Sequence, residues 1–147
     1  MCWFRVGSIA VASVLSDRYL RSVLSAAPLI GFIPVRDLSR ARAFYAGILG
    51  LEVTDVSPFA IAIRAGTTMV RLTRVEEFRA QPFTIAGWEV ADMDSIIDSL
   101  SARGVTFTRY DGMGQDERGI WSTPGGDQVA WFSDPDGNTL SLTRYSR

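Results

Sequence analysis

The chain contains neither histidine nor lysine, and all fifteen of its basic residues are arginine. The lack of histidine excludes a Ser-His-Asp triad, a Cys-His pair and every histidine-ligated metal site, and the lack of lysine excludes a Schiff base and a P-loop. The single cysteine, Cys2, can form neither an intrachain disulfide nor a thiolate zinc site. Much of the chemistry that small enzymes use is therefore unavailable to this sequence.

A strong excess of one charge is also absent. The net charge is −1 over 147 residues, of which 47% are hydrophobic and 21% are charged. This composition is typical of a globular domain, and it creates no field that would attract nucleic acid or an anionic membrane. We therefore expect a cytoplasmic domain with no nucleic-acid partner, no membrane partner and no cofactor.

The only apolar run near the N-terminus, residues 6–15, is too short to span a bilayer. Charged residues follow it at once, at Asp17 and Arg18, and no clean cleavage site comes next. We interpret residues 1–27 as an N-terminal extension with a short helix that begins near Ser16.

From residue 28 onward, one pattern occurs twice. In each half an apolar strand, over residues 29–35 and 83–90, leads into a polar residue that can cap a helix. The helices are predicted over residues 37–49 and 92–103, and each is closed by a glycine. Internal repetition of this kind indicates two copies of one supersecondary unit.

Short strands separated by turn residues follow each helix. They are predicted over residues 51–56, 59–65 and 69–74, and then over 105–110, 120–123, 128–133 and 139–144. The order is βαβββ, repeated in the second half with one additional short strand-like run, so one domain, residues 28–147, divides into module one (28–74), a linker (75–82) and module two (83–147). Neither half can bury its sheet alone. We therefore predict an α+β fold whose modules pair, within the chain or across a dimer, into a cupped, incomplete-barrel, eight-stranded mixed sheet.

Two groups of motifs are typical of one superfamily. Residues 34–38 (PVRDL), 43–45 (AFY) and 49–51 (LGL) resemble the opening module of the vicinal oxygen chelate superfamily, and residues 130–138 (AWFSDPDGN) resemble its closing signature. This superfamily includes glyoxalase I, extradiol dioxygenases, fosfomycin-resistance enzymes and bleomycin-binding proteins. The resemblance covers residues 29–144. It implies the cupped fold but not the reaction, because one fold hosts many chemistries.

The resemblance also indicates where metal-dependent members of the superfamily place their four ligands. In this chain those positions hold Ile30, Arg71, Ile85 and Ser141. Two aliphatic side chains, a guanidinium and a hydroxyl do not hold a divalent cation. We therefore expect no metal site, and we do not expect glyoxalase or dioxygenase activity of the metal-dependent kind.

Strand alternation places several side chains on the concave face, where they would line a ligand site. The predicted ligand-binding residues are Arg71, Phe32, Met69, Trp121, Trp131 and Ser141. Arg71 either fixes a carboxylate, phosphate or enolate oxygen or pairs with Glu89 to neutralise the sheet. Trp121 follows a Gly-rich loop, residues 111–119, which is either a lid or a solvated connection.

Three functions remain open. The first is binding of a small organic, anionic or planar molecule by a homodimer. The second is a metal-independent lyase or isomerase with Glu89, Tyr110 or Asp111 as the acid or base. The third is a non-catalytic interaction module whose cup is filled by its own side chains.

Overall fold

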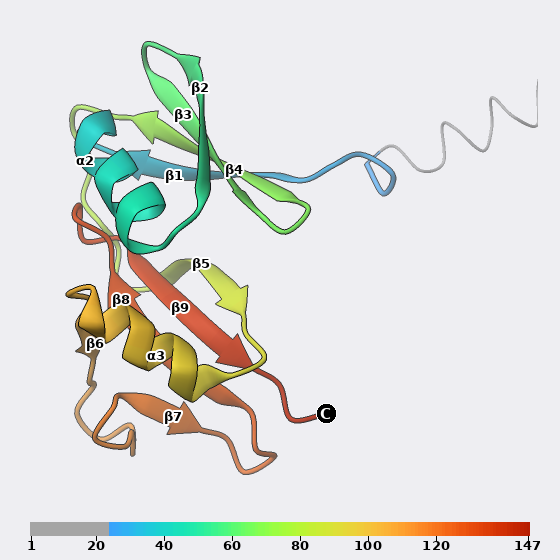
Figure 1. The fold of residues 1–147 in the computed structure, drawn as a ribbon, viewed down its shortest axis with the longest axis vertical. Helices are drawn as coiled ribbons and strands as arrows, with labels where there is room; N and C mark the ends of the chain where they lie inside the picture. Colours follow the sequence, from blue (N-terminus) through green and yellow to red (C-terminus); the bar gives the residue numbers. More distant parts are fainter. Residues whose placement is uncertain (1–23) are drawn as a thin grey trace, which may run out of the picture.

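Two modules, one above the other, make up the part of the chain that the computed structural model describes, residues 24–147 (Figure 1). Module one has the elements β1 (Ile30–Val35), α2 (Leu38–Arg42), the π-helix η1 (Ala43–Ile48), β2 (Glu52–Ser57), β3 (Ala60–Ala65) and β4 (Thr68–Arg74). Its four strands form a sheet in the order β1-β4-β3-β2. The β1–β4 pair is parallel and the other two pairs are antiparallel.

Module two forms a separate five-stranded sheet. Its elements are β5 (Thr84–Glu89), α3 (Met93–Ala102), β6 (Phe107–Thr108), β7 (Ile120–Ser122), β8 (Gln128–Ser133) and β9 (Thr139–Arg144). Both β6 and β7 pair with β8, on the edge that β9 leaves free, at residues 131–132 and 128–130. They are therefore two parts of one strand, interrupted by residues 109–119.

The α+β class and the repeated modules are confirmed. The strands lie in two separate sheets within one chain instead of in one eight-stranded sheet. In this arrangement β1 and β5 are each an edge strand of their own sheet. The predicted helix near Ser16 lies outside the described residues.

The helix predicted over residues 37–49 has its cap at Asp37, whose carboxylate accepts a hydrogen bond from Arg40 N at 2.6 Å. It changes from an α-helix to a π-helix after Arg42, and the wider turn is marked by the bond from Leu49 N to Phe44 O at 2.9 Å. Both Phe44 and its neighbour Tyr45 are buried. The sequence pattern predicts the extent of this helix but not its widened turn.

The hydrophobic core lies between the sheets and the helices. In module one it contains Ile33, Val35, Ile61, Ile63 and Leu72, and module two continues it through Ile97, Leu100, Phe132, Leu140 and Leu142. The other face of the module one sheet is open, with Phe32 at 64% exposure and Ile30 at 45%. Module one thus buries the helix side of its sheet and leaves the opposite face exposed along β1.

The turn at residues 134–138 joins the two modules. The buried carboxylate of Asp134 accepts a hydrogen bond from the Tyr45 hydroxyl at 2.9 Å. Nearby, Asn138 Nδ2 donates to Pro34 O at 2.8 Å, and Asp136 accepts from Arg36 N at 3.0 Å. The DPDGN motif is therefore a joint between the modules as well as a turn. No helix of residues 24–147 is long and apolar enough to cross a membrane.

Candidate functional site

Arg71 lies on the open face of the module one sheet, in register with Phe32 on β1 and Ala62 on β3. Met69 lies two residues along the same strand and is 37% exposed. Three of the predicted ligand-binding residues, Arg71, Phe32 and Met69, are thus brought together. We call this surface the Arg71 face. It combines a half-buried guanidinium with exposed apolar side chains.

The guanidinium of Arg71 forms no ion pair with any carboxylate in the described part of the chain. Glu89, the alternative partner, lies on β5 of the other sheet and pairs with Arg147 at 2.6 Å. The interpretation of Arg71 as a charge-neutralising residue therefore finds no partner for it within residues 24–147. A half-buried guanidinium without such a partner keeps its N–H donors available to an acceptor.

Trp131 dominates the open face of the module two sheet. It is in register with Ser141 on β9, and its indole Nε1–H donates to Thr84 Oγ1 on β5 at 3.0 Å. The indole therefore crosses β9, which explains why Ser141 is buried although its side chain is on the open face. Two further aromatic rings flank it. The Tyr110 ring meets it edge-on with centroids 5.8 Å apart, and Trp121 lies at 6.3 Å.

We call these three rings, Tyr110, Trp121 and Trp131, the aromatic platform. They come together because β6 and β7 both pair with β8, which carries Trp131. Trp121 lies on β7, and Tyr110 follows β6 by two residues, just after Thr108, which is in register with Trp131. The sequence predicted two tryptophans here as ligand-binding residues, and the structure places them side by side. Flat, half-exposed aromatic surface of this kind suits a planar or apolar ligand.

The excursion at residues 109–119 is held in place by its own side chains. Gln115 Nε2 donates to Thr108 O at 2.9 Å and to Gly119 O at 2.7 Å, and its Oε1 accepts from Tyr110 N at 2.6 Å. Arg118 ties the excursion to α3 through Asp94 at 2.5 Å. These bonds fix the position of Tyr110 beside the platform, so the segment is anchored at its base and is not simply a solvated connection.

The acid and base candidates lie in exposed positions. The Glu89 carboxylate is engaged by Arg147, Asp111 is exposed in the excursion, and Tyr110 is part of the aromatic platform. None of them is a buried group facing the open sheet. A general acid or base must reach the reacting atoms of a bound substrate, and these exposed side chains do not gather around one enclosed pocket.

Two residues of the site were not predicted. Arg64 adds a second cation to the Arg71 face, since its partner Met69 lies on that face. The alternation of residues 60, 62 and 64 along β3 carries this signal. Thr84 contacts Trp131 because of a β-bulge between Thr84 and Ala86, and Ile85 beside the bulge packs against the core. No feature of the sequence predicts that bulge.

The four positions that hold metal ligands in metal-dependent relatives do not fit a metal here. Ile30 and Arg71 lie on β1 and β4, and Ile85 and Ser141 lie on β5 and β9, so two are on each sheet. Their donor atoms amount to one guanidinium and one hydroxyl. Within residues 24–147, no group of three or more acidic or cysteine side chains is arranged to hold a metal ion.

The sequence and the fold of this chain are similar to those of known proteins. A family model described as Glyoxalase/Bleomycin resistance protein/Dioxygenase superfamily matches residues 25–142. A solved structure of a member of that superfamily from Sphaerobacter thermophilus is 27% identical, with a TM-score of 0.63 over 82% of this chain and 98% of that chain. No match was found among curated proteins.

Two further solved structures share the fold at lower identity. A glyoxalase family protein from Bacillus anthracis is 15% identical, with a TM-score of 0.65 over 82% of this chain and 95% of that chain. A lactoylglutathione lyase from Agrobacterium tumefaciens is 17% identical, with a TM-score of 0.62 over 81% and 93%. At these identities the likeness concerns the fold and not the reaction.

Proposed function

This chain belongs to the Glyoxalase/Bleomycin resistance protein/Dioxygenase superfamily, and we propose that it binds a small organic anion with a planar or aliphatic body, without a metal. The observation that carries this proposal is Arg71, a half-buried cation among apolar side chains that has no anionic partner within residues 24–147. A guanidinium in such a place binds a carboxylate or phosphate through two parallel hydrogen bonds. The aromatic platform offers a surface for the body of the same ligand.

A second copy of the chain is needed to bring these two surfaces together. Within one chain the modules are joined on the helix side, and β1 and β5 remain edge strands of separate sheets. We propose that β1 of one protomer lies beside β5 of its partner, which would unite the two sheets and set the Arg71 face against the partner's aromatic platform. An exposed, apolar edge strand favours such pairing, and a two-fold axis repeats the contact.

This assembly predicts a dimer of twice 16.2 kDa in sedimentation experiments at micromolar concentration. Phe32→Glu places a charge on the apolar β1 edge and is expected to give a monomer. The matched control is Val56→Glu, on β2 at the other edge of the same sheet, where the side chain is also exposed. A wild-type monomer, or equal behaviour of the two variants, would contradict the proposed contact.

The binding function is tested by a thermal-shift screen of small aromatic and aliphatic carboxylates and phosphates, followed by calorimetry on the compounds that stabilise the protein. Arg71→Ala is expected to weaken binding at least about tenfold, because a hydrogen bond to a charged group contributes about 1.5–3 kcal/mol. Arg71→Lys keeps the charge but loses the paired N–H donors of the guanidinium, so an intermediate affinity is expected. The control is Arg74→Ala on the same strand. Unchanged affinity in Arg71→Ala would make Arg71 a structural residue and defeat the proposal.

Metal independence gives a separate prediction. Protein purified without chelators is expected to contain far less than one zinc, nickel, iron or manganese ion per chain, because the guanidinium of Arg71 repels a cation at the position where relatives hold one. Ligand affinity is likewise expected to be the same before and after treatment with EDTA. Elemental analysis checks the first expectation, and one bound ion per cup would refute it.

A further inference from the structure

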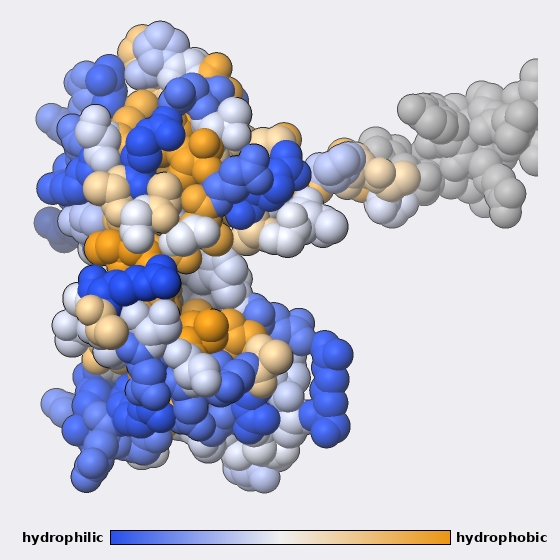
Figure 2. All heavy atoms as spheres, viewed as in Figure 1, coloured by the Kyte–Doolittle hydropathy of each residue, from blue (hydrophilic) through white to orange (hydrophobic). Residues whose placement is uncertain are grey.

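A cleft between the two modules lies on the helix side of both sheets, away from the Arg71 face and the aromatic platform. Its volume is about 290 Å³, just below the range of drug-sized ligand sites, about 300–1,000 Å³, so it suits a small ligand. Figure 2 shows apolar surface gathered in this waist between the modules. The residues that line the cleft are Leu49, Leu51, Trp88, Glu89, Val90, Ile96, Ser99, Leu100, Arg103, Phe132 and Leu142.

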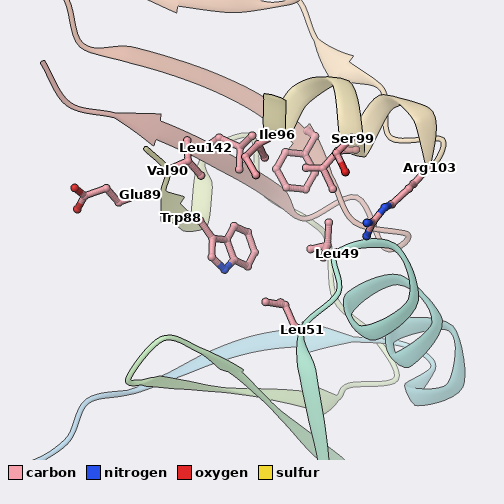
Figure 3. Close-up of a pocket in the computed structure, with 11 residues that line it drawn as sticks. Leu49, Leu51, Trp88, Glu89, Val90, Ile96, Ser99, Arg103 and Leu142 are labelled. Atoms are coloured by element: carbon pink, nitrogen blue, oxygen red, sulfur yellow. The ribbon is translucent and has the colours of Figure 1, made fainter. Parts of the chain in front are cut away.

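The Trp88 indole forms one wall of the cleft. It stacks on Phe132 with ring centroids 6.3 Å apart and an interplanar angle of 26°, so its orientation is fixed from the core side. The face of the indole that does not contact Phe132 lines the cleft, opposite Leu51 of module one (Figure 3). A slot with an aromatic wall and a leucine wall accepts a flat or branched apolar group.

Arg103 supplies the one cation of this cleft, at the end of α3. Its Nη1 donates to Ile48 O at 2.9 Å, which holds the side chain across the gap between the modules. This bond uses only one of the five N–H donors of a guanidinium, and no carboxylate of residues 24–147 forms an ion pair with Arg103. The remaining donors are available to an anion.

Negative charge does not compete for that cation. The only acidic residue among the lining residues, Glu89, is paired with Arg147 at 2.6 Å, and its side chain points away from Trp88 (Figure 3). The cleft therefore has an apolar middle and a free cation at one end. We infer that it binds a small monocarboxylate with an aromatic or branched apolar body, whose carboxylate meets Arg103 and whose body lies between Trp88 and Leu51. This site is distinct from the one proposed above and does not depend on it.

The test uses 1-naphthylacetate and its neutral counterpart 1-naphthylacetamide, which have nearly the same shape. Spectra of the full chain labelled with ¹⁵N at the tryptophan indoles, with Trp88→Phe to assign the signal, are expected to show that the Trp88 Nε1–H resonance shifts on addition of the carboxylate. Calorimetry is expected to give about tenfold tighter binding of the carboxylate than of the amide. Arg103→Gln is expected to remove this preference and leave amide binding unchanged, whereas the control Arg79→Gln keeps it.

A second variant keeps the inference testable if Arg103→Gln loosens the contact between the modules. Ser99 is exposed on α3 beside the cleft, so Ser99→Trp should fill the cleft and abolish binding of both compounds without changing the thermal unfolding midpoint. Equal binding of carboxylate and amide by the wild type would show that Arg103 only bridges the modules and would overturn the inference. Shifts confined to the resonances of Trp121 and Trp131 would overturn it as well, because they would place the compound on the aromatic platform.

Discussion

Replacing Asp134 by alanine is expected to lower the free energy of unfolding by about 3–5 kcal/mol. The buried carboxylate accepts four hydrogen bonds: from the Tyr45 hydroxyl at 2.9 Å, from Asn138 N and Nδ2 at 2.9 and 2.8 Å, and from Asp136 N at 2.9 Å. Alanine leaves the Tyr45 hydroxyl and the two backbone N–H groups without this acceptor, and Asn138 Nδ2 keeps only its bond to Pro34 O. Since single domains are stable by about 5–15 kcal/mol, the variant should lose a large share of its stability.

Urea denaturation followed by tryptophan fluorescence measures this loss, and a double-mutant cycle divides it. Tyr45→Phe removes one donor and leaves the other three bonds of Asp134 intact, so a loss of about 1–2 kcal/mol is expected. In the Asp134→Ala background the same change should cost much less, because the hydroxyl has already lost its acceptor. Equal effects of Tyr45→Phe in both backgrounds, or a loss under about 1 kcal/mol for Asp134→Ala, would show that the turn does not hold the modules together.

The same contact makes stability depend on pH in the alkaline range. Burial raises the pKa of Tyr45, and the neighbouring charge of Asp134 raises the pKa further. The unfolded chain releases the Tyr45 proton near pH 10 while the folded chain keeps it. The contribution of Tyr45 is therefore constant below about pH 9, and above about pH 10 the free energy of unfolding should fall by up to about 1.4 kcal/mol per pH unit. Tyr45→Phe is expected to remove this part of the alkaline slope.

The helix and strand positions could be predicted because they rest on local signals. Asp37 and Asp92 cap the two helices as expected, and Gly50 and Gly104 follow the helices with positive φ angles of 73° and 91°. The π-helical turn around Tyr45 could not be predicted. Tyr45 in this turn donates its hydroxyl to Asp134, and this contact between residues 89 positions apart leaves no periodic pattern in the sequence.

The division into two sheets was also beyond the sequence. The alternation along β1 and β5 shows that each strand has a core side and another side that needs a cover. It does not show whether the strand beside β1 or β5 belongs to the same chain or to a second copy, because the alternation of side chains is the same in both cases. The strand interrupted at residues 109–119 was predicted as two strands for a similar reason, since only the shared register on β8 reveals that they are one.

The site was predictable to the extent that it follows strand alternation. The positions of Arg71, Phe32 and Met69 on one face come from this rule. Contacts between elements required the structure: the bond from Trp131 to Thr84, and the bridge from Arg103 to Ile48 across the modules. Both contacts depend on how separate elements pack against each other, and the sequence of a single strand or helix does not determine that packing.

Gly87→Ala is expected to lower the free energy of unfolding by about 1–3 kcal/mol, although alanine is otherwise acceptable in a strand. Gly87 on β5 is in register with Ser141 on β9, and a Cβ at this position would lie 2.4 Å from Ser141 Oγ and 3.2 Å from Ser141 O. Ser141 is itself buried beneath the Trp131 indole, so its hydroxyl has little room to move away. The displacement should pass to Trp131 and weaken its bond to Thr84.

Gly31 provides the matched control. It lies on β1, the corresponding edge strand of module one, and β1 pairs with β4 in parallel, as β5 pairs with β9. The nearest atoms to a Cβ there belong to the Val70 side chain, the closest at 3.3 Å. Gly31→Ala is therefore expected to be neutral or to stabilise the fold by up to about 1 kcal/mol, because alanine restricts the unfolded chain. Adding Ser141→Ala to Gly87→Ala removes the atom at 2.4 Å and should restore most of the lost stability, and with it the tryptophan fluorescence of the wild type. If the double variant is no more stable than Gly87→Ala alone, the hydroxyl of Ser141 is not what excludes a side chain at position 87, and the close packing beneath the aromatic platform has another cause.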